Sequence, residues 1–403
     1  MRKALVISYY FPPMGMGGVQ RTAKFVKYLP EFGWKPIVLT DTPKAYFARD
    51  EGLLDELVNG QSEIYRTECT GSKNLLTEDN VFRFQNEGIR KIFSYLGQTF
   101  LIPDTKRLWK NKALKLAEQI LCEHKIDVLY ATAPPYTDFL IGCELKNKFN
   151  IPLVLDYRDS WLDCPINFYL TPLHKTLNKN LEENVLRNAD KIISINGKIK
   201  ELILQKYTFL NREDILVIPH GFDQEDFNIN GFHLKESEPF PKRKMRITYA
   251  GSFLYYYTPK YFIEGLAKVF QLEPHLKGKI EACFIGIFPE KYVKFFKKLN
   301  LYDSVNLTGY LKHSDCVRYL LASDVLWLML NKTHTSDIIS TGKLYEYFGA
   351  RKPILACLPD GVAKDSLKDY GAAKICEPDD PEAIAKLIIE FYKLYEKNNL
   401  PKP

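Results

Sequence analysis

The stretch that decides the fold is SDIISTGKLYEYFGARKPILA, Ser336 to Ala356. It predicts a polar loop, a short helix and a buried strand, in that order. Ser340 and Thr341 are residue types that favour the N-cap of a helix, and a glycine followed by Arg-Lys-Pro ends it. The apolar run Ile354–Ala356 then predicts a strand. The start of such a helix offers unpaired backbone N–H groups and a positive dipole to an anion.

Two charged side chains of this helix indicate which anion would bind. Lys343 falls in the first turn, where a cation is unfavourable for the helix dipole, so a lysine there is better explained by a phosphate ligand. Glu346 shares its face of the helix, and a carboxylate can accept two hydrogen bonds from a vicinal diol such as ribose. A phosphate together with a diol indicates a nucleotide. The alternative is an ordinary Lys–Glu pair on a solvated helix.

Size and composition predict two globular domains. The chain has 403 residues, 46% of them hydrophobic and 13% aromatic, and a net charge of +7. This modest positive charge permits attraction to anionic lipid or phosphorylated ligands, but it is not a nucleic-acid signature. The eight cysteines are scattered without a CxxC pair, which favours a reduced, cytoplasmic setting and argues against a zinc site. The N-terminus predicts a strand rather than a signal peptide, and no window is apolar enough to span a membrane.

Short apolar runs alternate with helix-sized segments, which is typical of parallel sheets covered by helices. We predict strands at Ala4–Tyr9, Pro36–Leu39, Val128–Tyr130, Leu153–Leu155, Lys191–Ile195 and Ile215–Ile218, then at Arg246–Ala250, Ala282–Ile285, Val305–Leu307, Val325–Leu330 and Pro353–Cys357. A segment rich in Gly, Pro and charge separates the two sets. We therefore expect two α/β domains, residues 1–218 and 245–380, joined by a linker at 219–244 and followed by a C-terminal helix at 381–403.

A glycine-rich loop follows the first predicted strand, in SYYFPPMGMGGVQ. At a strand-to-helix turn, Gly15, Gly17 and Gly18 would let backbone N–H groups approach a ligand closely. The spacing is not that of a dinucleotide fold, because the third glycine would fall at Gln20, and no Walker pattern occurs. A flexible turn without a ligand is the alternative.

The segment LVLDYRDSW, Leu153 to Trp161, places polar side chains at the end of a buried strand. Residues at the carboxyl end of a parallel strand point into the crevice in which α/β proteins bind ligands. Arg158 and Asp159 are the candidate catalytic residues, because they would face a sugar or its leaving phosphate there. The alternative is an internal Arg–Asp structural pair, with Trp161 capping the core.

The second predicted domain opens with AGSFLYYYTPK. Gly251 after a strand again suits close approach to a phosphate, with Ser252 beside it. The aromatic residues Phe253 and Tyr255–Tyr257 would stack on a base or sugar, or else only pack between domains.

Taken in order, these segments resemble the family 4 glycosyltransferases of the GT-B fold, over nearly the whole chain. The motifs that carry the resemblance are the glycine loop at Gly15–Gly18, IPHGFD, AGSF and KLYEYFGARKPILA. DYRDSW, PDTKRLW and APPY are similar to segments of the bacterial surface-polysaccharide branch. The resemblance implies two Rossmann-like domains facing across a cleft, with a C-terminal helix that crosses back to the first domain.

The resemblance implies a retaining, metal-independent transferase without a cofactor. Its substrate would be a UDP- or GDP-linked sugar, and its acceptor a polysaccharide or lipid-linked glycan. The implied donor-binding residues are Gly17, Gly18, Gly251, Ser252, Lys260, Thr341, Gly342, Lys343 and Glu346. Among them, Glu346 would bind the ribose hydroxyls. We expect a cytoplasmic protein. Its basic, aromatic stretch Ile89–Trp109 would rest on anionic lipid at the inner membrane face, and the alternative is an ordinary solvated face.

Two positions depart from the family pattern. Ile338 stands where a second Glu, eight residues before Glu346, would contact the donor sugar. Where an Arg and a Lys are expected after the AGS turn, the chain offers only Lys260. Two alternatives therefore stay open: a non-catalytic scaffold with this fold, and a nucleotide-sugar epimerase, which would need acid/base carboxylates or His in the cleft.

Overall fold

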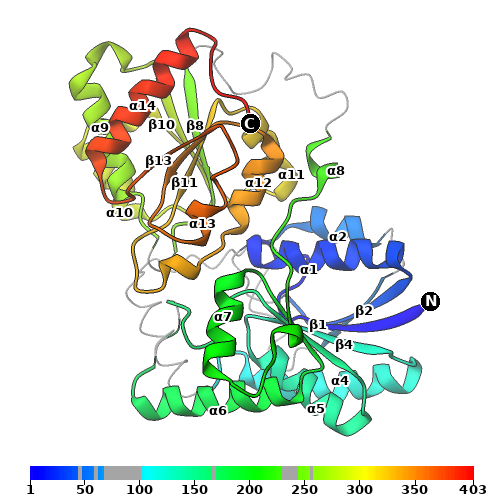
Figure 1. Cartoon of the computed structure of the whole chain (residues 1–403). Coiled ribbons are helices and arrows are strands. Elements are labelled where there is room, and N and C mark those ends of the chain that lie inside the picture. The colour runs from blue at the N-terminus through cyan, green and yellow to red at the C-terminus, as the bar shows by residue number, and fades with distance from the viewer. Residues whose placement is uncertain are drawn as a thin grey trace. The chain divides into compact units, whose positions relative to one another are not determined.

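The computed structural model describes residues 1–43, 48–58, 62–67, 101–165, 167, 169–228, 244–254 and 257–403. The chain divides into two compact units, Met1–Pro219 and His220–Pro403, each built on one parallel sheet (Figure 1). Residues 89–100 of the basic stretch, and Tyr255 and Tyr256, lie outside the described residues. Within the described ranges, no helix is long and apolar enough to cross a membrane.

The sheet of the first unit has seven strands in the order β3-β2-β1-β4-β5-β6-β7. They are β1 (Arg2–Ile7), β2 (Trp34–Asp41), β3 (Glu63–Thr67), β4 (Val128–Ala133), β5 (Leu153–Tyr157), β6 (Lys191–Ser194) and β7 (Ile215–Val217). The helices are α1 (Gly17–Tyr28), α2 (Glu51–Val58), α4 (Lys110–Glu123), α5 (Thr137–Phe149), α6 (Pro172–Asn188) and α7 (Gly197–Lys206). Helices α1 and α2 pack together on one face of the sheet, and α4, α5 and α6 on the other (Figure 1).

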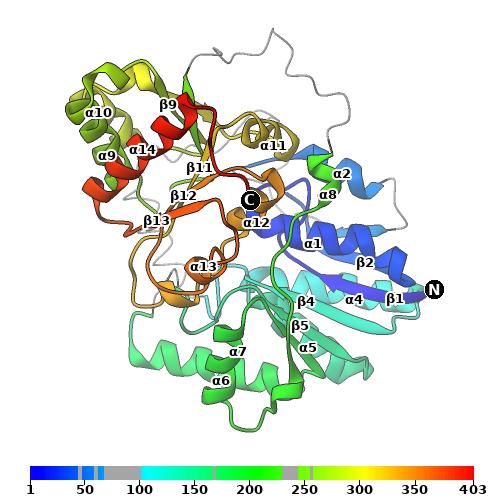
Figure 2. The ribbon, with the colours of Figure 1, turned by 45° about the horizontal axis from the view of Figure 1, so that its top comes forward.

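The sheet of the second unit has six strands in the order β10-β9-β8-β11-β12-β13. They are β8 (Met245–Ala250), β9 (Ile280–Ile285), β10 (Val305–Gly309), β11 (Val325–Met329), β12 (Ile354–Cys357) and β13 (Ala373–Cys376). The helices are α8 (Gln224–Phe227), α9 (Lys260–Leu272), α10 (Glu290–Lys298), α11 (His313–Leu321), α12 (Gly342–Ala350), α13 (Val362–Asp365) and α14 (Pro381–Glu396). Figure 2 shows α9, α10 and α14 on one side of this sheet and α11 and α12 on the other.

Both sheets have the strand order of a Rossmann-like domain, so the predicted α/β fold with two such domains is confirmed. In each sheet the order reverses once, between β1 and β4 and between β8 and β11. Ligands of such sheets bind outside the carboxyl ends of the strands at this reversal. The prediction omitted β3 and β13, because both lie at sheet edges and their mostly half-buried residues form no continuous apolar run.

The C-terminal helix α14 packs on α9 within the second unit. Asp380 caps it, as its residue type predicts, by accepting hydrogen bonds from the N–H groups of Glu382 and Ala383, both at 3.0 Å. Ile384 of α14 packs closely on α9, because a Cβ on Gly265 of α9 would lie 2.8 Å from the Cγ2 atom of Ile384. This contact makes α14 part of the second core, and a return of the helix to the first domain stays a prediction.

Candidate functional site

Helix α12 is fixed at the point where the strand order of the second sheet reverses. The hydroxyl of Tyr347, which is fully buried, donates to the carbonyl oxygen of Trp327 in β11 at 3.0 Å. The same hydroxyl accepts from the N–H of Ala250, the last residue of β8, at 3.1 Å. One side chain therefore holds the helix against both strands that flank the reversal.

The side chain of Lys343 runs across Gly251. A Cβ on Gly251 would lie 2.1 Å from the Cε atom of Lys343, and the backbone there has a φ of +151°, so space and conformation both require glycine. On the other side of this turn, a Cβ on Gly286 would lie 2.6 Å from the carbonyl oxygen of Gly251. The structure thus brings together two predicted donor-binding residues from different elements.

The ammonium of Lys343 is surrounded by aromatic rings rather than acids. It lies 5.7 Å from the ring centroid of Tyr249 and 5.3 Å from that of Tyr257. In the part of the chain that the structure describes, no carboxylate lies within ion-pair distance of it. Removal from water lowers the pKa of Lys343 to about 8. Because a desolvated cation is costly without a counter-charge, this site is suited to an anion.

The first turn of α12 is open to such an anion. Thr341 is the N-cap residue, as predicted, but its side chain makes no capping hydrogen bond, and no acidic residue lies in the first turn. A Cβ on Gly342 would meet no atom within 4 Å. Nearby, the Ser252 hydroxyl accepts from the N–H of Ile287 at 3.0 Å and so braces the turn after β8. The helix start therefore keeps its backbone donors available beside Lys343.

Glu346, one turn further along α12, is paired with a histidine that the sequence did not single out. The Nε2 atom of His313 lies 3.2 Å from both carboxylate oxygens of Glu346. Its Nδ1 atom lies 3.8 Å from a carboxylate oxygen of Asp226, in α8. His313 opens α11 and is only 8% exposed. The pairing fixes the orientation of the Glu346 carboxylate.

Two other positions of the second unit bear on the donor prediction. Lys260 is exposed at the first residue of α9, and its ammonium lies 3.8 Å from a carboxylate oxygen of Glu264 on the same helix. Its predicted role at the donor phosphates stays a prediction. Ile338 is buried, so this position offers no polar side chain to a sugar.

In the first unit, the glycine loop ends in the start of α1. The helix begins at Gly17, two residues earlier than Val19, where the sequence places its start. Its N-cap residue, Met16, has a φ of 75° and provides no side-chain cap. A Cβ on Gly18 would lie 3.3 Å from the Nη1 atom of Arg158, so a glycine allows the arginine to approach the backbone there.

Arg158 binds backbone carbonyl groups rather than the carboxylate beside it in sequence. Its Nη1 atom donates to the carbonyl oxygen of Gly18, and its Nη2 atom to that of Pro134. The side chain is buried. Arg158 therefore links the start of α1 to the loop after β4, and its assignment as a catalytic residue stays a prediction.

A buried Arg–Asp pair does exist at this strand end, but with other partners than the neighbouring Arg158 and Asp159. Asp156 of β5 pairs with Arg21 of α1 at 2.9 Å, and both side chains are almost fully buried. The hydroxyl groups of Tyr130 and Thr132 also donate to Asp156, at 2.8 and 2.9 Å. This carboxylate has a structural role, because its hydrogen-bonding capacity is used inside the unit.

The carboxylate of Asp159 is the less constrained of the two candidate catalytic side chains, and its catalytic role stays a prediction. It is half-buried, and among the described residues no group donates a hydrogen bond to its carboxylate. Removal from water raises the pKa of Asp159 to about 6, against the opposing attraction of Arg158. A carboxylate that titrates near neutral pH can accept or deliver a proton.

Comparison with known proteins identifies the family. Residues 16–226, more than half of the chain, match the model for Glycosyltransferase Family 4, and residues 232–402 match the model for Glycosyl transferases group 1. The chain belongs to glycosyltransferase family 4. The family resemblance predicted from the motifs is therefore confirmed, and the protein is an enzyme of this class.

Solved structures of other glycosyltransferases share the fold of this one at low identity. A glycosyltransferase from Rickettsia africae has a TM-score of 0.64 and 16% identity, over 99% of this chain and 90% of that one. Anabaena Alr3699/HepE, solved with UDP and glucose, has a TM-score of 0.63 and 16% identity, over 99% of this chain and 92% of that one. WaaG, a glycosyltransferase involved in lipopolysaccharide biosynthesis, has a TM-score of 0.59 and 13% identity, over 98% of this chain and 92% of that one. No match was found among curated proteins.

Proposed function

We propose that this glycosyltransferase transfers a sugar, with retention of configuration and without a metal ion, from a UDP- or GDP-linked donor to a polysaccharide or lipid-linked glycan. The observation that carries the proposal is the placement of Lys343 and Glu346 on the first turns of α12, with Lys343 lying across Gly251. The structural relatives agree with it, because one was solved with UDP and glucose and another is involved in lipopolysaccharide biosynthesis.

In this proposal the second unit stabilises the departing nucleoside diphosphate. Lys343 and the open N–H groups of the α12 start neutralise the charge that develops as the sugar leaves, which is the task a metal ion has in other transferases. Glu346 accepts hydrogen bonds from the two ribose hydroxyls, so it sets the nucleotide in register with Lys343. Because Lys343 and the start of α12 favour the developing diphosphate, catalysis depends on them, whereas Glu346 contributes to nucleotide binding.

The first unit supplies the acceptor side in this proposal. Asp159, with its pKa near 6, orients the attacking hydroxyl or accepts its proton. Arg158 keeps the glycine loop in place through the carbonyl of Gly18. The acceptor is expected at the cytoplasmic face of the membrane, where lipid-linked glycans would be presented to the enzyme.

Nucleotide binding tests the proposal directly. At about 100 times its Kd, UDP or GDP should raise the melting temperature by roughly 5–10 °C, whereas Glu346→Ala should show little shift. Glu290→Ala is the matched control, because this exposed glutamate of the same unit pairs only loosely with Lys294, at 3.6 Å. The proposal is wrong if no nucleoside diphosphate changes the melting temperature of the wild-type protein.

Transfer itself is tested with radiolabelled nucleotide sugars and a membrane extract as acceptor. Incorporation should persist in excess EDTA, and NMR of the product should show the same anomeric configuration as the donor. Loss of transfer in EDTA would contradict transfer without a metal ion. A product with inverted anomeric configuration would contradict the retaining mechanism.

The second candidate is a member of this enzyme family that kept nucleotide binding and lost transfer, and the buried Ile338 favours it, since the sugar-contacting Glu that the family resemblance implies is missing there. It predicts normal UDP binding together with no transfer from any donor. An equal loss of cellular glycan in strains carrying a gene deletion and Asp159→Asn, a change expected to leave UDP binding unchanged, would exclude it.

A further inference from the structure

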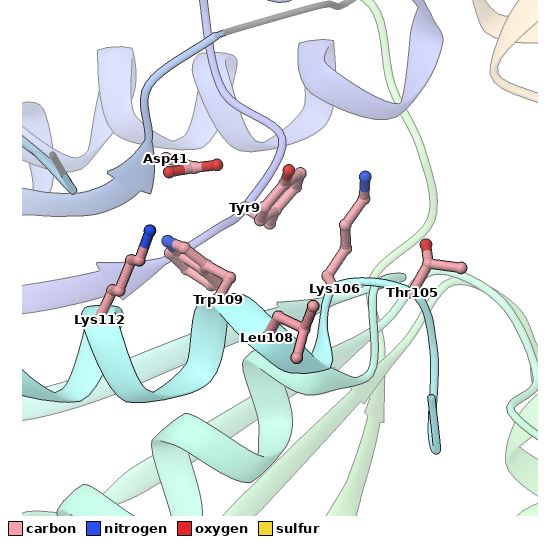
Figure 3. A pocket seen from close by; sticks show the side chains of 7 residues that line it. All are labelled: Tyr9, Asp41, Thr105, Lys106, Leu108, Trp109 and Lys112. Atoms are coloured by element: carbon pink, nitrogen blue, oxygen red, sulfur yellow. The ribbon is translucent and has the colours of Figure 1, made fainter. Parts of the chain in front are cut away.

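A cavity of about 220 Å³ opens within the first unit, beyond the carboxyl ends of β1 and β2. Its lining includes Tyr9, Asp41, Thr105, Lys106, Trp109 and Lys112. Figure 3 shows the two lysines standing on either side of the Tyr9 and Trp109 rings, with Asp41 beyond the rings. The cavity therefore combines two cations, a carboxylate and aromatic walls.

Lys106 is a half-buried cation without a close counter-charge. Its ammonium lies 4.7 Å from the ring centroid of Tyr9 and 5.7 Å from that of Tyr10. Asp104 and Asp41 attract it, but neither lies within ion-pair distance among the described residues. Loss of water lowers the pKa of Lys106. Aromatic faces compensate only part of the lost hydration, so an anionic ligand would stabilise this ammonium.

The opposite side of the cavity is held by a chain of hydrogen bonds through Thr67. The indole N–H of Trp109 donates to the Thr67 hydroxyl at 3.0 Å, and that hydroxyl donates to the Asp41 carboxylate. Tyr9 packs edge-to-face on Trp109, with ring centroids 5.2 Å apart. A carboxylate and aromatic rings held in this way are suited to a sugar, whose hydroxyls donate to the carboxylate and whose apolar face packs on a ring.

We propose that this cavity binds an acidic sugar of the acceptor glycan, with its carboxylate or phosphate group on Lys106 and a hydroxyl on Asp41. The cavity lies at the carboxyl ends of the strands of this sheet, and Asp159 follows the carboxyl end of β5 in the same sheet. The acceptor role rests on the proposed function, whereas the preference for an acidic group rests on the cavity alone.

Three small probes test the preference on the full chain without nucleotide: methyl glucuronide, glucose 6-phosphate and methyl glucoside. NMR titration should show at least one acidic probe binding about tenfold more tightly than the neutral glucoside, since a charge-assisted hydrogen bond is added. The two acids separate a carboxylate from a phosphate preference, and raised salt should weaken only their binding. Equal affinities for all three probes, or no binding of either acid, would overturn the proposal.

Substitutions of Lys106 test whether the preference for acidic probes arises at this cavity. Lys106→Met replaces the ammonium by an uncharged side chain of similar length and should remove the tenfold preference for the acidic probe. Lys106→Arg keeps the positive charge and should keep the preference. Lys175→Gln, at an exposed lysine of the same unit, should leave the preference unchanged. A preference that survives Lys106→Met overturns the site. UDP affinity is measured on the same samples: normal UDP binding with equal probe affinities overturns the acidic-sugar site alone, whereas wild-type protein that fails to bind UDP overturns the proposed function and the acceptor role with it.

Discussion

The Nε2 atom of His313 lies 3.2 Å from both carboxylate oxygens of Glu346, although the two residues are 33 positions apart in the sequence. The other ring nitrogen faces Asp226 at 3.8 Å. The imidazole thus lies between two acids and restricts the rotation of the glutamate that we assign to the ribose hydroxyls. In the proposed function, His313 is therefore a positioning residue for nucleotide binding, because it would act through Glu346.

Removal of the imidazole should weaken UDP binding about five- to tenfold, because Glu346 loses the hydrogen bond that orients it. Isothermal titration of His313→Ala, Glu346→Ala and the double variant checks this. If His313 acts through Glu346, adding His313→Ala to Glu346→Ala has almost no further effect. Fully additive losses would contradict it. His275→Ala, an exposed histidine of the same unit, should bind UDP normally.

Nucleotide affinity should fall as pH rises through about 8. The free protein holds Lys343 with a pKa lowered to about 8, and only the protonated form attracts a diphosphate, so affinity is full below that pH and decreases above it. Lys343→Met should bind UDP at least about tenfold more weakly at pH 7, with a flatter profile between pH 7 and 9. An unchanged slope in the variant would show that another group titrates.

Asp159→Asn should lower the transfer activity and raise the free energy of unfolding. The folded pKa of Asp159, about 6, is above its ordinary value, so ionisation opposes folding above pH 6 and has no such effect below pH 4. The variant should therefore be more stable by roughly 1–3 kcal/mol at pH 7.5 and by less at pH 5 in urea unfolding. Transfer should fall at least about 100-fold with UDP binding unchanged.

Asp163 in the same loop provides a control of opposite sign. Hydrogen bonds from Lys206 and Ser160 overcome burial and lower the pKa of Asp163, so its charge supports folding at neutral pH and loses that effect in acid. Asp163→Asn should thus reduce stability at pH 7.5. If Asp159→Asn also reduced stability at pH 7.5, the result would contradict the proposal that the charge of Asp159 opposes folding.

Gly251→Ala should unfold more easily and bind UDP more weakly. The new Cβ would lie 2.1 Å from the Lys343 side chain and would displace it from the turn. Gly278→Ala is a matched control, because its φ of +83° imposes backbone strain while no atom lies within 4 Å of its Cβ. Both variants carry a cost of about 1–2 kcal/mol from the backbone, and the collision adds roughly 1–3 kcal/mol at Gly251. Equal losses, measured by urea unfolding, would mean that Lys343 moves aside freely.

The fold could be predicted because buried parallel strands appear in sequence as apolar runs. The runs that precede Gly251 and α12 place Gly251 and the start of α12 at the carboxyl edge of one sheet. The positions of Lys343 and Glu346 on the first turns of α12 could be predicted from the residue types that begin and end this helix, whereas their role at the donor stays a prediction. No local pattern marks His313, whose partner depends on how α11 packs beside α12. The spatial role of Arg158 was likewise hidden, since the carbonyl groups that it binds belong to Gly18 and Pro134, both distant in sequence.

Tyr347 ties α12 to β8 and β11, two strands of one sheet, and the partners of Lys343 and Glu346 described above also belong to the second unit. In the proposed function, the residues assigned to the nucleotide diphosphate and ribose on α12 therefore lie in one continuous half of the chain, from His220 onward. A recombination event near residue 219 would transmit that half intact to a new first unit. New glycan linkages can arise in this way from shuffled halves, without any change in how the nucleotide is read.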